Sequence, residues 1–307
     1  MGAGCRLDLR NESGPGEAMK FWQNVSWIET DQLIEMAKFA EEVGFEGVLD
    51  GDHVAFPEPL LTPYPYTPDG KPPMNSDWNY PDNFACAAAI AAATTNLRYV
   101  TDIFVLAARN PLMVAKAAGT VAILGNHRFV LGVAAGWMKD EFDLAGIDFF
   151  TRGKRMDEMI ELMRKLWMGG PVEHHGEFFD MPPLNMEPSP KRLVPIFAGG
   201  ASKPALRRAA RLCDGWLNAG NTPDEIPRIL AEIHRMRREA GRDHLPFESI
   251  VTLTTPPSLD DFKWAEDAGA DGILAYPPMF ALGPKSTIDQ KKQMMEQYAE
   301  TFISKMR

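Results

Sequence analysis

The segment GFEGVLDGDH, residues 44–53, joins the end of one predicted helix to a buried strand and a polar loop. Gly44 follows an amphipathic stretch, and glycine commonly ends a helix at this position. The run from Phe45 to Asp50 is short and largely apolar, which is typical of a strand buried on both faces of a parallel sheet. The segment therefore predicts one step of an alternating helix and strand pattern, with polar side chains after the strand.

The same alternation extends in both directions along the chain. We expect strands over residues 21–27, 45–50, 97–106, 128–134, 194–198, 215–219, 247–253 and 272–276. We expect helices over residues 30–43, 82–93, 111–124, 151–168, 202 onward, 224–240, 259–268 and 287–303. Eight strands, each followed by a helix, predict a closed (β/α)8 TIM barrel. A doubly wound open sheet is the alternative, but no Gly-x-Gly-x-x-Gly motif follows the first strand.

One long irregular stretch, from Ala55 to Pro81, interrupts the pattern after strand 2 and is crowded with Pro, Tyr and Trp. Loops of this length in a compact domain are commonly lids, interface segments or disordered. We expect an ordered insertion that covers a pocket or contacts a second subunit, with an inert surface loop as the alternative. Residues 1–18 are expected to be a flexible N-terminal tail or an expression remnant, and residues 19–307 a single domain.

Composition excludes several classes of function. The 307 residues carry a net charge of -10 without a basic stripe, so a nucleic-acid partner is not expected. The three cysteines, Cys5, Cys86 and Cys213, form no Cys-x-x-Cys motif, so neither a disulfide framework nor a metal site is expected. The apolar run from Ala85 to Ala93 is too short to span a membrane, and no signal peptide is recognisable. We expect a cytoplasmic protein that acts on a small molecule.

The carboxyl ends of the strands are the places to search, because a barrel of this kind carries its active site there. Three loops stand out: Asp50-Gly51-Asp52-His53, Ala135-Gly136-Trp137 and Gly199-Gly200-Ala201-Ser202.

His53, with Asp52 beside it, has the chemistry of a general acid or base near neutral pH. A histidine that only binds a loop carbonyl is an equally good interpretation. Trp137 suits either a wall for a flat ring or a cover for the core. His174 and His175 lie in a polar hairpin-like stretch, where surface hydration is favoured over metal binding. These residues predict a barrel enzyme without specifying its reaction.

The loop Ala198–Ser202 joins strand five to a helix. Its glycines and the following helix start suit a phosphate, because backbone N–H groups and the helix dipole favour an anion. A tight turn with a serine cap would have the same sequence.

Several segments together resemble the luciferase-like monooxygenase superfamily, and most closely its branch that depends on the deazaflavin coenzyme F-420. They follow the family's order and cover most of the chain from Met19 to about Trp216, whereas the C-terminal third matches only in outline. The matching segments are GFEGVLDGDHVAFP (44–57), LRYVTDIFVLAARNPLMVAK (97–116), RFVLGVAAGWMKDEFDLAG (128–146), TRGKRMDEMIELMRKLW (151–167) and VPIFAGGAS (194–202). The fold of this superfamily is a (β/α)8 barrel, which agrees with the count of strands.

The resemblance implies a site residue by residue. It places His53 as the catalytic residue at the reactive edge of the deazaflavin. It also implies a non-proline cis peptide at the strand-three bulge, which we place between Asp102 and Ile103. The cofactor-binding residues that it implies are Asp52, Asp102, Ile103, Gly136, Trp137, Gly199, Gly200, Ala201 and Ser202.

One departure from the family changes the expected substrate. In the sugar-phosphate dehydrogenase branch, a glutamate proton donor occupies the position of Trp137, so a hexose phosphate is not expected here. The substrate pocket looks more apolar, and its candidate walls, besides Trp137, are Phe56, Tyr64, Tyr66 and Trp78.

The resemblance implies an F-420-dependent oxidoreductase that transfers a hydride between deazaflavin C5 and a small apolar substrate. The alternatives are an FMN-dependent monooxygenase that uses reduced flavin and oxygen, and a non-catalytic flavin-binding protein on the same fold. Lys203, Arg207 and Arg208 are either contacts for the coenzyme's anionic tail or an exposed helix face. A homodimer is also implied by the resemblance.

Overall fold

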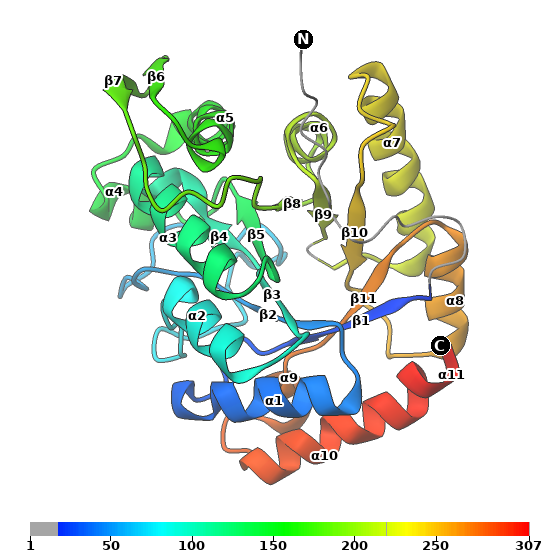
Figure 1. Ribbon diagram of the computed structural model, residues 1–307. Coiled ribbons are helices and arrows are strands. Elements are labelled where there is room, and N and C mark those ends of the chain that lie inside the picture. Colours follow the sequence, from blue (N-terminus) through cyan, green and yellow to red (C-terminus); the bar gives the residue numbers. More distant parts are fainter. Residues whose placement is uncertain (1–17, 219, 307) are drawn as a thin grey trace.

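Eight parallel strands close into a barrel in the computed structural model, which describes residues 18–218 and 220–306 (Figure 1). Neighbouring strands pair in the order β3-β2-β1-β11-β10-β9-β8-β5, and a β3–β5 pairing closes the ring, with β4 as a short extension beside β5. The predicted TIM barrel is therefore confirmed. The strands are β1 (Lys20–Asn24), β2 (Gly47–Asp50), β3 (Arg98–Thr101), β4 (Phe104–Val105), β5 (Phe129–Ala134), β8 (Ile196–Gly199), β9 (Gly215–Leu217), β10 (Glu248–Val251) and β11 (Gly272–Ala275).

Helices surround the barrel, with α1 and α10 below it in Figure 1, α7 and α8 to the right and α6 above. The principal helices are α1 (Leu33–Val43), α2 (Asn83–Ala93), α3 (Pro111–Leu124), α5 (Arg152–Met168), α6 (Lys203–Leu212), α7 (Ile226–Glu239), α8 (Leu259–Asp267) and α10 (Ile288–Tyr298). Shorter ones are α4 (Lys139–Leu144), α9 (Pro278–Leu282) and α11 (Ser304–Met306). Further single turns cover Thr30–Gln32, Leu106–Ala108, Phe149–Thr151, Pro223–Glu225 and Ala299–Ile303.

Local chemistry explains where helices begin and end. Pro111 opens α3, and the Asn110 side chain accepts from the amides of the next turn. Gly44 ends α1 in the left-handed conformation, with φ of 96°. Thr30, in contrast, does not cap α1; it starts a tight turn before that helix.

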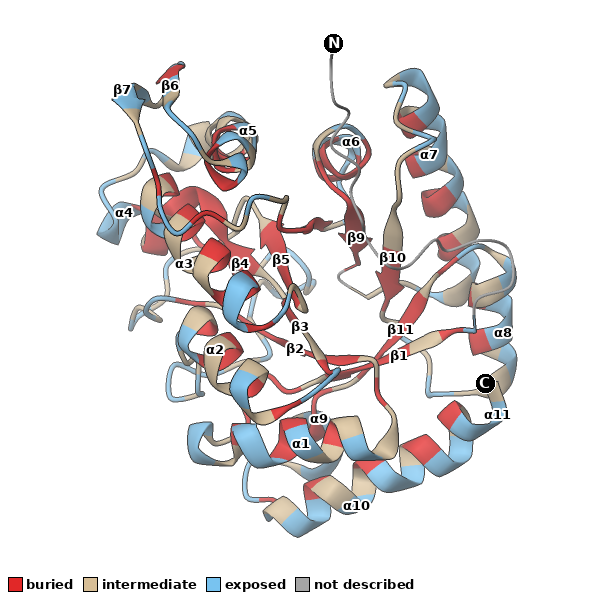
Figure 2. Cartoon of the chain, in the orientation of Figure 1, coloured by how far each residue is buried: buried red, intermediate tan, exposed pale blue. Residues whose placement is uncertain are grey.

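The hydrophobic core has two layers. A large cluster lies between the strands and the surrounding helices, and Figure 2 shows both the strands and the inner helix faces as buried. A second cluster contains one side chain from each barrel strand. Its members are Trp22, Leu49, Val100, Val130, Phe197, Leu217, Ile250 and Leu274. The barrel interior is therefore packed solid, as in other barrels of this class.

An ion pair and the indole of Trp22 fill the amino-terminal end of the barrel. Arg98 on β3 makes two hydrogen bonds of 2.9 Å to Glu248 on β10, on the opposite side of the ring. The Arg98 guanidinium also lies 4.8 Å from the centre of the Trp22 ring. Gly47 and Gly272 make room for that indole, because a Cβ at either position would lie 2.4 Å and 2.7 Å from it.

One predicted strand differs from the structure, and one predicted histidine environment is corrected. The expected strand over 97–106 is broken at Asp102 and Ile103, between β3 and β4, and the peptide bond joining these two residues is cis. The predicted polar hairpin is present as β6 (Val172–His175) and β7 (Asp180–Leu184). The prediction that His174 is hydrated at the surface is wrong, however. Its ring is buried, and its Nε2 lies 3.0 Å from Glu158 Oε1.

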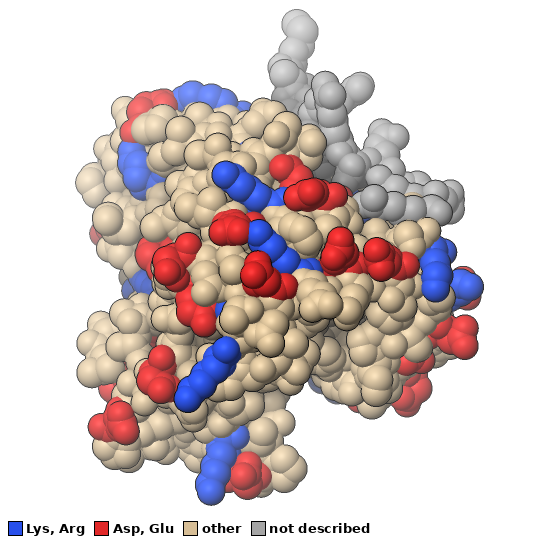
Figure 3. Space-filling view, turned by 90° about the horizontal axis from the view of Figure 1, so that it is seen from below, with Lys and Arg blue, Asp and Glu red and all other residues tan. Residues whose placement is uncertain are grey.

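The surface carries both signs of charge. In Figure 3, acidic and basic side chains are interspersed, and ion pairs such as Lys292–Glu35 join α10 to α1. Among the described residues, no helix is both long and apolar enough to cross a membrane. No group of three or more His, Cys, Asp or Glu side chains within that part of the chain is arranged to hold a metal ion.

Residues 1–17 lie outside the described part of the chain, and with them almost all of the expected N-terminal tail.

Candidate active site

His53 lies just beyond the carboxyl end of β2, with only 9% of its surface exposed. Its Nδ1 is 3.1 Å from Oε2 of Glu141, which α4 supplies after strand β5. The other carboxylate oxygen of Glu141 accepts a 2.7 Å hydrogen bond from the Val54 amide. The acid that contacts the histidine is therefore Glu141, rather than its sequence neighbour Asp52.

Asp52 ties the end of β2 to the bulge after β3. Its carboxylate receives Arg109 Nη2 at 2.9 and 2.8 Å and the Val105 amide at 2.8 Å. Burial raises the pKa of the Asp52 carboxyl, and the Arg109 guanidinium opposes this shift. Asp52 therefore connects the end of β2 to β4 and stabilises this part of the barrel.

Two further carboxyl groups lie at the same end of the barrel. Burial raises the pKa of Asp50 to about 8, and the charges of Asp52 and Asp102 add to the shift. Burial also raises the pKa of Asp102 to about 7, while Asn24 donates a 3.3 Å hydrogen bond to its Oδ2. Near neutral pH Asp50 is therefore largely protonated and Asp102 is partly protonated, which makes this end of the barrel less negative than its sequence suggests.

Aromatic rings surround His53 edge to face. The centroids of Tyr80, Phe56 and Trp137 lie 5.0, 5.8 and 5.9 Å from the imidazole centroid. Tyr64 packs against Trp137 at 5.0 Å. Aromatic side chains thus pack around one titratable ring. Tyr80 was not predicted, because it lies at the far end of the insertion and no motif marks it.

The remaining predicted wall residues lie farther from His53. Tyr66 contacts Tyr64 at 5.3 Å but is 58% exposed. Trp78 packs on Trp27 at 4.8 Å, and Trp27 in turn contacts Tyr80 at 6.4 Å, so Trp78 is linked to His53 only through these two rings. Trp27 also contacts Phe280 at 5.3 Å, which extends the aromatic cluster to α9.

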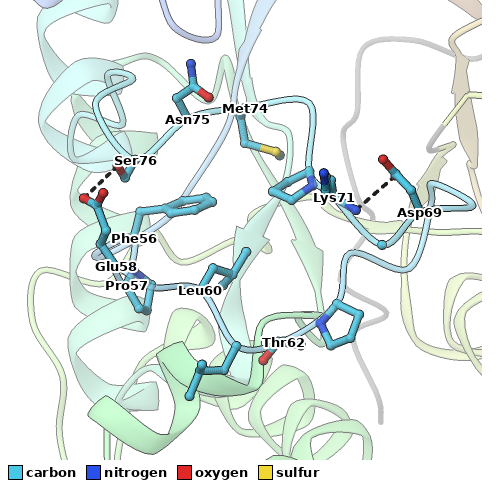
Figure 4. Close-up of a pocket in the computed structure, with 14 residues that line it drawn as sticks. Phe56, Pro57, Glu58, Leu60, Thr62, Asp69, Lys71, Met74, Asn75 and Ser76 are labelled. Atoms are coloured by element: carbon cyan, nitrogen blue, oxygen red, sulfur yellow. Dashed lines mark hydrogen bonds between the residues drawn. The ribbon is translucent and has the colours of Figure 1, made fainter.

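The insertion after strand 2 is ordered and contains an open cavity of about 510 Å³ (Figure 4). Phe56, Leu60 and Met74 point towards its centre, so Phe56 lies between this cavity and His53. Asp140 on α4 holds the insertion in place by accepting from the Leu61 and Thr62 amides at 3.2 and 2.8 Å. The insertion therefore has the position of a cover beside the barrel mouth.

Ile103 and two glycines shape the opposite part of the mouth. A Cβ at Gly199, the last residue of β8, would lie 1.8 Å from Ile103 Cδ1, so the two strand ends meet in close contact. Gly136 has φ of 90°, and a Cβ there would lie 2.7 Å from both Phe142 and Val105. Of the predicted cofactor residues here, Ile103 and Gly199 therefore adjoin one another, whereas Gly136 packs on Phe142 and Val105.

The predicted phosphate loop leads directly into α6. Gly200 adopts φ of 98°, and its carbonyl accepts a 2.9 Å hydrogen bond from Trp216 Nε1. Ser202 is the N-cap residue, accepting from the Ala205 amide at 3.4 Å, and Ala201 beside it is exposed. This is an exposed helix start with a positive dipole end, which favours an anion.

The predicted basic tail contacts divide into two groups. Arg208 is buried and pairs with Asp157 and the Gly153 carbonyl, so it stabilises the contact between α6 and α5. Lys203 and Arg207 are exposed on α6. Of the three, these two are positioned to meet a ligand in solvent.

Several buried polar atoms near the mouth lack a hydrogen-bond partner among the described residues. They include Gln23 Oε1 at the end of β1, the Tyr80 hydroxyl and Arg109 Nη1. Buried polar groups are normally paired, so these unpaired atoms mark this end of the barrel as a candidate site for a polar ligand.

Known proteins resemble this chain in sequence, over nearly its whole length in one case and over about three fifths of it in another. An uncharacterized protein of Mycobacterium tuberculosis is 38% identical over 290 residues, covering 94% of this chain and 100% of that protein. The pyrimidine monooxygenase RutA of Escherichia coli is 27% identical over 202 residues, covering 62% of this chain and 55% of its own.

Solved structures share the fold. The coenzyme F-420-dependent tetrahydromethanopterin reductase of Methanopyrus kandleri superposes with a TM-score of 0.74 at 15% identity, over 95% of this chain and 100% of that one. The monooxygenase RslO1 of Streptomyces bottropensis also gives 0.74, at 18% identity, over 94% and 100%. The family model for luciferase-like monooxygenase matches residues 9–300. The chain therefore belongs to the luciferase-like monooxygenase family of oxidoreductases.

Proposed function

We propose that this enzyme is an F-420-dependent oxidoreductase that acts on a small apolar substrate, with His53 as the proton-handling residue. The observation that carries the proposal is the buried His53–Glu141 pair, enclosed by aromatic rings at the carboxyl ends of the barrel strands. A titratable ring surrounded by aromatic side chains suits proton transfer to a substrate that is itself apolar.

Separate groups of residues would contact the ring of the coenzyme, bind its phosphate and exchange a proton with the substrate. The coenzyme, when bound, would accept or supply a hydride at C5 of its deazaflavin ring. Ile103 and Gly199 would offer a smooth apolar contact for a flat ring, and the loop from Gly200 to Ser202 would bind the phosphate at the start of α6. His53 would exchange a proton with the substrate through Nε2, because Nδ1 faces Glu141.

The exposed cations on α6 favour F-420 over FMN. Lys203 and Arg207 follow the phosphate loop directly, where an anionic tail beyond the phosphate would find them. F-420 carries such a tail, whereas FMN ends at its phosphate. The second candidate, an FMN-dependent monooxygenase, is favoured by relatives such as the FMNH2-dependent dimethylsulfone monooxygenase of Pseudomonas fluorescens, 28% identical over 166 residues.

Turnover with each cofactor tests the proposal. Oxidised F-420 is mixed anaerobically with a panel of secondary alcohols, and reduced F-420 with activated alkenes, while reduced FMN is assayed for oxygen uptake. We expect turnover with F-420, and we expect His53→Ala to lower it by about 100-fold or more with little change in coenzyme affinity. His175→Ala, which removes an exposed histidine, is the matched control. Unchanged turnover in His53→Ala would contradict the role of that residue.

A further inference from the structure

Glu141 is a buried acid whose two oxygens both face hydrogen-bond donors. It is 3% exposed, although it lies on the short helix α4 among charged neighbours. Oε1 accepts from the Val54 amide at 2.7 Å and lies 3.9 Å from Arg109 Nη1. Oε2 lies 3.1 Å from His53 Nδ1. A buried carboxylate costs free energy unless it is paired in this way. The burial of Glu141 therefore indicates a specific role for this residue.

The donors determine where the proton of the imidazole lies. A backbone N–H can only donate and a guanidinium carries only donors, so Oε1 must accept. Arg109 Nη1 forms an ion pair with Oε1, and an ionised carboxylate accepts hydrogen bonds but has no proton to donate. The proton shared with His53 must then be carried by Nδ1. In the neutral imidazole this leaves Nε2 as the accepting nitrogen.

We propose that Glu141 is the positioning residue that fixes His53 as its Nδ1–H tautomer, so that Nε2 is the nitrogen available to a substrate. This inference rests on the proposed function for the use that the enzyme makes of Nε2, but the tautomer itself does not. The other groups around the imidazole are Asp52, which Arg109 neutralises, and the rings of Tyr80, Phe56 and Trp137. The three rings carry no carboxylate, and the Asp52 carboxylate is bound to Arg109. Glu141 is therefore the acid that sets the tautomer.

The Glu141→Gln variant separates this role from simple packing. A carboxamide has the same shape but one accepting oxygen and one donating nitrogen. The Val54 amide requires the oxygen, so the side-chain nitrogen faces His53 Nδ1. Nδ1 must then accept, and the proton moves to Nε2. The substitution therefore inverts the tautomer, whereas a purely structural role for Glu141 would leave it unchanged.

Nitrogen NMR on the full-length protein, with 15N-labelled histidine, reads the tautomer directly. The His53 signals are assigned by their loss in His53→Ala. They are recorded at increasing pH until they no longer change, so that the neutral imidazole is observed. We expect a protonated Nδ1 in the wild type and a protonated Nε2 in Glu141→Gln. Asp143→Asn is the matched control, because it removes the same charge from an exposed position on α4. We expect it to keep the wild-type signals.

Two results would overturn the inference: a protonated Nε2 in the wild type, which needs no variant, or the wild-type tautomer in a folded Glu141→Gln. Once a substrate is found, Glu141→Gln should lower turnover by about 10-fold to 100-fold, as part of the ~100-fold to 10,000-fold that proton transfer contributes. If neither F-420 nor FMN supports turnover, the proposed function fails while the tautomer result still stands. The two failures are therefore distinguishable.

Discussion

Replacing Asp50 by asparagine should change how the stability of the barrel depends on pH. Asp50 ends β2 and is only 1% exposed, and its Oδ2 has no hydrogen-bond partner among the described residues. Burial raises its pKa to about 8 in the folded chain, and the nearby Asp52 and Asp102 charges add to this. In the unfolded chain an aspartate has a pKa of about 3.9.

The difference between the folded and unfolded pKa of Asp50 determines the sign and the size of the pH effect on stability. Between about pH 4 and pH 8 the folded chain holds a proton that the unfolded chain has lost, so the free energy of unfolding falls as the pH rises. One proton of difference corresponds to about 1.4 kcal/mol per pH unit, or about 2.7 kcal/mol between pH ~5.5 and ~7.5. The carboxamide in Asp50→Asn cannot ionise, so this contribution disappears in the variant. Asp102 contributes a slope of the same sign to both proteins.

Urea denaturation followed by tryptophan fluorescence measures the effect at about pH 5.5, 6.5 and 7.5. We expect the wild type to lose stability over this range faster than Asp50→Asn. The difference between the two should change by about 1.4 kcal/mol per pH unit. Asp143→Asn, at an exposed position, should remain parallel to the wild type. Parallel curves for the wild type and Asp50→Asn would refute the reasoning, whatever the offset between them.

Two further substitutions test the packing of the barrel. Gly199→Ala should lower the free energy of unfolding by about 1–3 kcal/mol, because its Cβ would lie 1.8 Å from Ile103 Cδ1, whereas the exposed Ala201→Ser should change it by less than about 0.5 kcal/mol. Arg98→Met should cost about 3–5 kcal/mol by leaving Glu248 buried without its main partner. Converting both to Met should restore part of that loss, and a single-variant loss below about 1 kcal/mol in urea denaturation would contradict the ion pair's importance.

Much of the fold was predictable because it depends on local chemistry. The helix over 111–124 has the predicted ends, since Asn110 and Pro111 specify its start in sequence. The barrel itself follows from eight buried apolar runs that alternate with helices. The cis peptide between Asp102 and Ile103 was expected only from the resemblance, and it is confirmed; β-propensity, which is continuous over 97–106, gives no sign of the break.

The site was predictable only in part. His53 was identified because it follows a barrel strand directly. Glu141 was missed, although it lies four residues after Trp137 in a segment already singled out, because nothing in sequence shows that this one acid of α4 turns inward. Arg208 illustrates the reverse case: its charge suggested a ligand contact, but the fold pairs it with Asp157.

Binding of the cofactor tests the central claim most directly. The full-length protein is titrated with oxidised F-420 and, separately, with FMN, and the fluorescence of each is followed. The account predicts saturable binding of F-420 and none of FMN over the same concentrations. Saturable binding of FMN alone, or of neither, would contradict it.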